Sequence, residues 1–64
     1  MQKIVHAPAL LSRRSVEAIT SISRASIYRL MKAGEFPTPV RVSANRVAWR
    51  EADIRLWIEA RQPN

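Results

Sequence analysis

The 64-residue chain contains no cysteine and a single histidine, His6. Without cysteine the chain can form neither a disulfide nor a thiolate metal site, and a lone histidine offers no ligand set, so we expect no metal centre and no cofactor. No apolar run approaches the roughly 18 residues of a membrane span, and residues 1–10 lack the continuous apolar core of a signal peptide. These absences predict a soluble protein of a reducing compartment, the cytoplasm of a bacterium, encoded by the host or by a phage.

Acidic residues are scarce as well. Five Asp and Glu stand against eleven Lys and Arg, which gives a formal net charge of +6 and a sequence pI near 11.5. Residues 24–50 hold six of the basic residues and one acid, whereas residues 51–64 hold two basic residues and three acids. Positive charge concentrated in the middle of a chain is expected of a phosphate-facing surface. An anionic membrane would attract it too, but the arginines do not share one long amphipathic helix, so nucleic acid is the favoured partner and no membrane is expected.

An enzyme is not expected. Catalysis needs titratable groups that converge in a pocket, and one histidine, no cysteine and five scattered acids supply almost none. The function is therefore sought among binding proteins.

Residues 23–34 carry the start and stop signals of a short helix. Ser23 is a good N-cap, because its hydroxyl can accept a hydrogen bond from a free N–H group of the first turn. Ile22 and Ile27 have the spacing of a hydrophobic staple around that cap. Gly34 can adopt the left-handed conformation that ends a helix. The signals predict a helix up to Ala33.

The two faces of this helix differ in chemistry. At 100° per residue, Ile27, Leu30 and Met31 share one face, which we predict is buried. The opposite face is basic with an aromatic edge and comprises Ala25, Arg29 and Lys32, with Tyr28 at the edge and Arg24 in the first turn. A short helix of this kind has the dimensions of a major-groove reader, although a solvated surface helix would look the same in isolation.

A preceding helix is predicted from its own cap. Leu10 and Leu11 lead into it, Ser12 is the expected N-cap, and Val16 and Ile19 point inward up to an end near residue 20. Residues 20–23 then form a tight connection, and two short helices joined in this way are typical of a helix-turn-helix. The same pattern occurs in αα-hairpins of unrelated proteins.

Two details of this region bear on function and strain. Arg13 and Arg14 fall in the first turn, where the helix dipole disfavours cations, which indicates either a phosphate partner or plain solvent exposure. Ser21 stands in the turn where many helix-turn-helix proteins have glycine, so a slightly strained or differently shaped turn is expected.

A β-hairpin is predicted after the prolines at 37 and 39, which block a helix. Residues 40–42 and 47–49 alternate with period two, joined by residues 43–46. The alternation places Val40, Val42, Val47 and Trp49 inward and Arg41, Arg46 and Arg50 outward. Such a hairpin after a helix-turn-helix is typical of the wing of a winged helix, but a small stabilising sheet with solvated arginines fits equally.

The last predicted helix begins after Arg50, with Ile54, Trp57 and Ile58 toward the core. Both tryptophans are expected to pack there. A thin second stripe of apolar residues, Ala52, Leu56 and Ala60, would cover the N-terminal arm or contact a second copy of the chain. The predicted organisation is an arm over residues 1–9, one domain over residues 10–61 and a frayed end over residues 62–64.

Taken in order, these segments resemble the AlpA family of small phage-type DNA-binding proteins, related to MerR-like winged helix-turn-helix domains. The resemblance covers residues 10–61, and its most specific part is the run Ser23-Arg-x-x-Ile27-Tyr-Arg-Leu30. It implies a mainly α fold with a small β-hairpin, that is, a winged helix-turn-helix. It also implies a sequence-specific regulator of a prophage or genomic-island integrase gene, an excisionase, or both, whose partners are double-stranded DNA, an integrase and further copies of itself.

By this resemblance the helix that starts at Ser23 enters the major groove and the hairpin lies along the backbone or in the minor groove. Arg29 is the candidate for guanine O6 and N7, which its planar guanidinium matches. The full set of predicted DNA contacts is Arg24, Ala25, Ser26, Tyr28, Arg29, Lys32, Arg41 and Arg46. The alternative is a small basic module for RNA or protein, which a salt-matched titration of DNA against RNA would distinguish.

Overall fold

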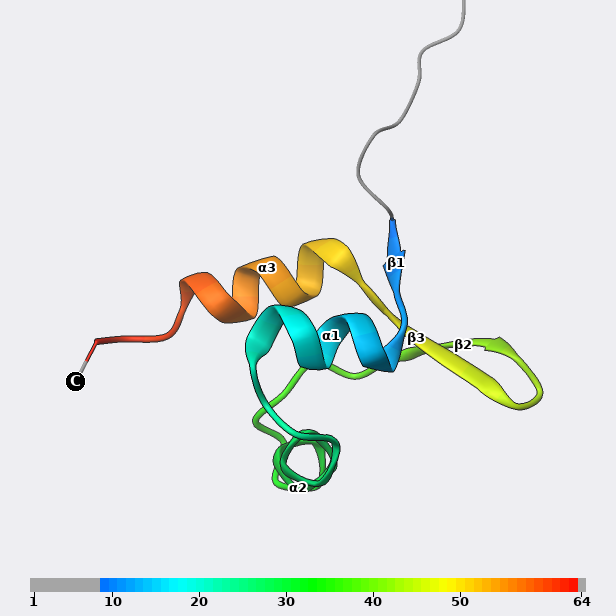
Figure 1. Ribbon diagram of the computed structural model, residues 1–64, viewed down its shortest axis with the longest axis horizontal. Coiled ribbons are helices and arrows are strands. Elements are labelled where there is room, and N and C mark those ends of the chain that lie inside the picture. Colours follow the sequence, from blue (N-terminus) through cyan, green and yellow to red (C-terminus); the bar gives the residue numbers. More distant parts are fainter. Residues whose placement is uncertain (1–8, 64) are drawn as a thin grey trace, which may run out of the picture.

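The computed structural model describes residues 9–63, so the predicted arm lies almost wholly outside the described residues. These residues form three helices and a small antiparallel sheet (Figure 1). In chain order the elements are β1 (Leu10–Leu11), α1 (Arg13–Thr20), α2 (Arg24–Lys32), β2 (Val40–Ser43), β3 (Arg46–Arg50) and α3 (Glu51–Glu59).

The sheet has three strands in the order β1-β3-β2. The predicted hairpin of β2 and β3 is confirmed, with Val40 opposite Ala48 and an irregularity in register between Arg41 and Ser43. Leu10 and Leu11 directly precede the Ser12 cap of α1 as predicted, but they also pair as β1 with the end of β3, which was not predicted. This pairing joins residues about forty positions apart, so no local pattern in the sequence signals it.

The predicted helix signals are confirmed in atomic detail. The Ser12 hydroxyl accepts a hydrogen bond from the Ser15 N–H at 3.1 Å, and the Ser23 hydroxyl accepts one from the Ser26 N–H at 3.3 Å. Gly34 has a φ of 76°, the left-handed conformation that stops α2. The ends described here are therefore fixed by residues that lie within a few positions of them in the sequence.

The turn between α1 and α2 is strained as expected. Ser21 has a φ of 63° and a ψ of 25°, and its N–H donates a 2.8 Å hydrogen bond to the Glu17 carbonyl. For a residue with a Cβ atom this conformation costs about 1–2 kcal/mol. The fold tolerates that cost at the corner that sets the angle between the two helices.

The core is a single cluster between the helices and the base of the sheet. Trp49, Ile27, Ile54 and Val16 are its fully buried members, and Leu11 and Phe36 close it. The prediction for Trp49 is confirmed. Trp57 is half-buried and packs against the cluster from one side, so it belongs to the core only in part.

Four residues predicted to point inward are instead exposed: Val42, Val47, Ile19 and Ile58. The hairpin extends beyond the helices (Figure 1), so only its base is covered and Ala48 is buried beside Trp49. Ile19 and Ile58 lie along a groove between α1 and α3 that no described residue fills. The sequence pattern identified the apolar faces correctly, but the domain is too small to cover all of them.

Candidate nucleic-acid interface

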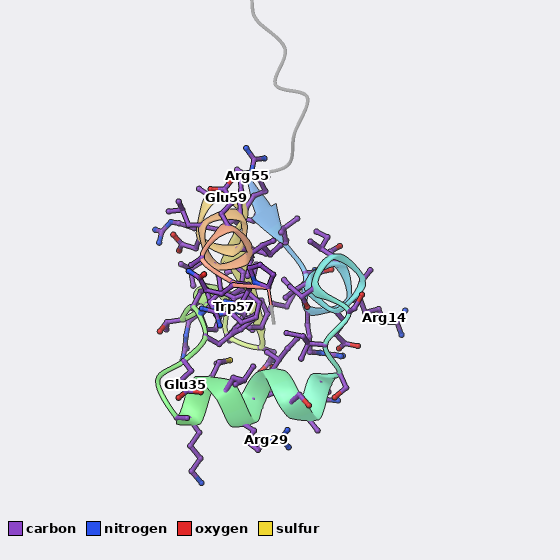
Figure 2. The ribbon with its side chains drawn as sticks, turned by 90° about the vertical axis from the view of Figure 1, so that its left-hand side faces the viewer. Arg14, Arg29, Glu35, Arg55, Trp57 and Glu59 are labelled. Carbon is purple, nitrogen blue, oxygen red and sulfur yellow. The ribbon has the colours of Figure 1, made fainter. Side chains whose placement is uncertain are left out.

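Helix α2 lies at one edge of the molecule, and its two faces behave as predicted. Ile27 is fully buried while Leu30 and Met31 pack against the core. This anchoring turns the opposite face away from the protein, and Figure 2 shows Arg29 directed outward from α2, on the side away from α1 and α3. The residues exposed on that side are Arg24, Ala25, Tyr28, Arg29 and Lys32, with Ser26 half-buried.

Contacts within α2 hold its basic side chains over the exposed surface. The Arg29 Nη2 donates a hydrogen bond to the Ser26 hydroxyl at 3.2 Å. The Arg24 guanidinium lies 6.0 Å from the centroid of the Tyr28 ring, at the outer limit of a cation–π contact. Within residues 9–63 no acidic side chain pairs with either arginine or with Lys32, so their charges are free for an external anion.

A polar hollow of about 360 Å³ opens next to α2, where the N-terminus of α1, the first turns of α2 and the hairpin tip converge. Four arginines from three elements line it, and among the residues that the structure describes only Arg13 of the four has an acidic partner, Glu17. Its lining residues are Ser12, Arg13, Arg14, Arg24, Tyr28, Asn45, Arg46 and Val47. Positive charge gathered in a concave, polar site favours an anion.

The structure brings some of the predicted residues together and leaves others apart. Arg24 and Tyr28 of α2 meet Arg46 of the hairpin in the hollow. Arg41 is exposed on β2, opposite Val47, and does not line it. The hollow therefore joins the N-terminal half of α2 to the hairpin, while Arg29 and Lys32 lie on the outer face of the helix.

Five lining residues were absent from the predicted site, and two of them, Arg14 and Asn45, are candidates for contacts with an anion. Arg14 had a signal in the sequence, because a cation in the first turn of a helix opposes the helix dipole unless an anion is near. Asn45 had none, since an asparagine in a hairpin turn is explained by the backbone alone. Only the packing of the hairpin beside α1 reveals that Asn45 reaches the hollow.

The chemistry available here is that of binding. Guanidinium groups stay charged and match phosphate with two parallel hydrogen bonds. Across residues 9–63, no group of three or more His, Cys, Asp or Glu side chains could hold a metal ion. In the same part of the chain no helix has the length and apolar character required to cross a membrane.

Comparison with known proteins assigns the chain to a family. Residues 9–62 match the sequence model described as Prophage CP4-57 regulatory protein (AlpA), a range that contains all six elements of the fold. The uncharacterized protein ORF88 of Enterobacteria phage P4 is 35% identical over 43 residues, which cover 67% of this chain and 49% of that protein. The chain thus matches about half the length of this relative. The predicted resemblance is confirmed, and the chain belongs to the AlpA family of prophage regulatory proteins.

Proposed function

We propose that the protein is a DNA-binding transcriptional regulator of a prophage or genomic island, and that it binds duplex DNA as a winged helix-turn-helix. In this proposal α1 and α2 are the helix-turn-helix, α2 is the recognition helix and the β2–β3 hairpin is the wing. The observation that carries the proposal is the basic hollow that links the first turns of α2 to the hairpin tip. The regulatory family to which the chain belongs supports it.

The exposed face of α2 reads bases in the major groove. The groove of B-DNA is about 12 Å wide and admits an α-helix. Arg29, oriented by Ser26, donates two hydrogen bonds to O6 and N7 of a guanine. Ala25 lets the helix backbone approach the base edges, and Lys32 contacts a phosphate at the far edge of the groove.

The hollow receives a backbone phosphate beside the recognition helix. Arg14, Arg24 and Arg46 supply the charge, and the Tyr28 hydroxyl and Asn45 amide donate further hydrogen bonds. Because these groups come from α1, α2 and the wing, one phosphate would fix all three elements relative to the duplex. Arg41 contacts the next phosphate or the edge of the minor groove.

The test is a titration of short, fluorescently labelled DNA and RNA duplexes with the full chain at matched salt, in which fluorescence anisotropy reports binding. Neutralising about 4–6 phosphates predicts a log–log slope of affinity against salt of about −4 to −5 on DNA. Arg24→Ala should weaken binding, whereas the charge-matched control Arg61→Ala, whose guanidinium packs over the Trp57 ring, should not. Equal or tighter binding to RNA would favour the small RNA-binding module instead.

The biological role we propose is to shift a mobile element toward excision, and two routes are open to it. The protein either raises integrase expression or shapes the DNA of the attachment site directly. A DNA bend at such a site would cost about 1–6 kcal/mol, offset by the added contacts. We favour the transcriptional route, since the matched family is a regulatory one.

Deleting the gene while supplying integrase from an independent promoter separates the two routes. Excised circles and integrase transcript are both measured. Excision restored by integrase alone supports transcriptional control, and excision that still requires this protein supports the architectural role. No change in either quantity would refute both.

A further inference from the structure

A surface groove of about 290 Å³ runs between α1 and α3 and shares no lining residue with the basic hollow. Ile19 is 50% exposed and Ile58 38% exposed along it, with Leu11 and Ile54 at its floor. Covering apolar surface that is exposed to water is favourable, in proportion to the area removed from water. A contiguous apolar hollow on so small a protein is a candidate site for another chain.

The rim of the groove carries charges of alternating sign. Glu51, Arg55 and Glu59 follow one another at intervals of four along α3 and all line the groove. Arg55 donates a hydrogen bond to Glu51, and within residues 9–63 Glu59 has no cationic partner. When two copies of this row lie antiparallel and are offset by one helical turn, the base of each row faces an acid of the other. The rim of one copy is therefore complementary in charge to the rim of a second copy.

The α3 rim of the groove lies at the end of the molecule opposite the exposed face of α2. Figure 2 shows Arg55 and Glu59 on α3 at one end and Arg29 on α2 at the other. A copy bound to DNA through α2 would therefore leave the groove open.

We propose that the occupant is a second copy of the same chain, in a two-fold pair whose α3 helices are antiparallel. When the axis passes midway between positions 55 and 59, each Arg55 lies beside Glu59 of the other copy. Ile19 and Ile58 of the two copies then cover one another. The same patch on both copies forms the interface, as two-fold symmetry requires.

This arrangement has a consequence for DNA, which rests on the proposed function. Because the α3 rim of the groove and the exposed face of α2 are at opposite ends of the molecule (Figure 2), a pair joined through α3 directs the two α2 helices away from each other. The pair cannot place both helices on adjacent turns of one straight duplex. It instead holds two duplexes, or two distant sites of one molecule, on its outer faces.

Self-association is tested without DNA by sedimentation velocity over a range of concentrations. The wild type should shift from monomer to dimer, and Ile58→Glu should stay monomeric. Leu56→Glu is the matched control, since Leu56 lies two residues away on α3, is 63% exposed, and lines a separate hollow with Pro37 and Trp57. A wild type that remains monomeric, or a Leu56→Glu variant that loses association equally, would overturn the proposal and leave the groove to another protein or to residues 1–8.

Charge reversal tests the register of the pair. Arg55→Glu should abolish the dimer, because it places an acid beside Glu59 of the other copy. Adding Glu59→Arg to the same chain should restore the dimer with the charges exchanged. Failure of the double variant to associate, while its circular dichroism matches that of the wild type, would refute the antiparallel register.

Bridging is measured by retention of a fluorescent duplex on beads that carry a second duplex. Wild type and Leu56→Glu should retain it, whereas Ile58→Glu should bind either duplex alone but lose retention. A dimer that binds single duplexes and never bridges would overturn the opposed placement of the α2 helices. If the proposed function itself is wrong, the wild type will bind no duplex yet will still dimerise, so the two failures are distinguishable.

Discussion

The indole N–H of Trp57 donates a hydrogen bond to the main-chain carbonyl of Glu35 at 2.9 Å, across 22 positions of sequence. The indole N–H of Trp49 donates in the same way to the Pro37 carbonyl, also at 2.9 Å. Phe36 lies between, with its ring centroid 4.8 Å from that of Trp57 and 6.4 Å from that of Trp49. The two tryptophans thus hold the segment that joins α2 to the hairpin, and with it the position of α2.

Replacing Trp57 by Ala should lower the free energy of unfolding by about 3 kcal/mol, the lower end of the usual range because the side chain is only half-buried. Trp57→Phe should cost less, since it keeps the contact with Phe36 and loses mainly a hydrogen bond worth about 1 kcal/mol. Urea denaturation followed by circular dichroism measures both. Leu56→Ala, at an exposed neighbouring position, is the control, and an unchanged midpoint for Trp57→Ala would refute the packing described.

Loss of the cap on α2 should be measurable by the same method. Ser23→Ala removes the hydroxyl that accepts from the Ser26 N–H, at a cost of about 1 kcal/mol, whereas Ser23→Gly should cost only about a few tenths. Equal losses for the two variants would mean that the hydroxyl is not what stabilises the start of the helix.

The ends of α1 and α2 could be predicted because their causes are local. A capping serine and a terminal glycine act within a few residues of the helix end, and both were found where the sequence placed them. Strand β1 could not be predicted in the same way, since its partners are Trp49 and Arg50. A two-residue strand has no periodicity of its own.

The candidate site was predictable on α2 and only in part elsewhere. Periodicity separated the buried Ile27 from the exposed Arg29, because a helix with one apolar face has little choice of orientation. Periodicity failed for Val42, because alternation along a strand shows which residues share a face but not whether anything covers that face. The role of Asn45 depends on how the hairpin docks beside α1, which is a property of the whole fold.

The strained turn predicts a stabilising substitution. Ser21→Gly should raise the free energy of unfolding by about 0.5–1 kcal/mol, because the relief of the positive φ exceeds the entropy that glycine adds to the unfolded chain. Ser21→Val should destabilise, since a branched side chain suits this conformation least. Thermal unfolding of the two variants in parallel decides the matter, and a stabilising Val would contradict the geometry.

The recognition-helix proposal predicts a difference in kind between two arginines. Arg29→Ala should erase the preference for the cognate site, whereas Arg46→Ala should weaken all sequences alike and reduce the salt slope by about 1. Competition titrations with cognate and scrambled duplexes measure the preference. Full discrimination by Arg29→Ala would show that α2 does not read the bases through this residue.

The phosphate-binding role of the hollow predicts an effect at a residue on α1. Arg14→Ala should weaken binding to all duplexes and reduce the salt slope by about 1. Arg13→Ala provides the comparison, because Arg13 is already paired with Glu17 and should matter less. A larger effect of Arg13 than of Arg14 would contradict the arrangement proposed for the hollow.

In the proposed binding mode, the nine residues of α2 limit how many base pairs one copy can read. At 1.5 Å per residue the helix is about 13 Å long, which corresponds to about four base pairs at a spacing of 3.4 Å. A given four-base-pair sequence recurs by chance about every 256 base pairs, so a genome of about 10⁶ or more positions contains thousands of copies of it. One four-base-pair site is therefore too short to specify a single position in a genome. Specificity must then come from the number, spacing and orientation of several such sites.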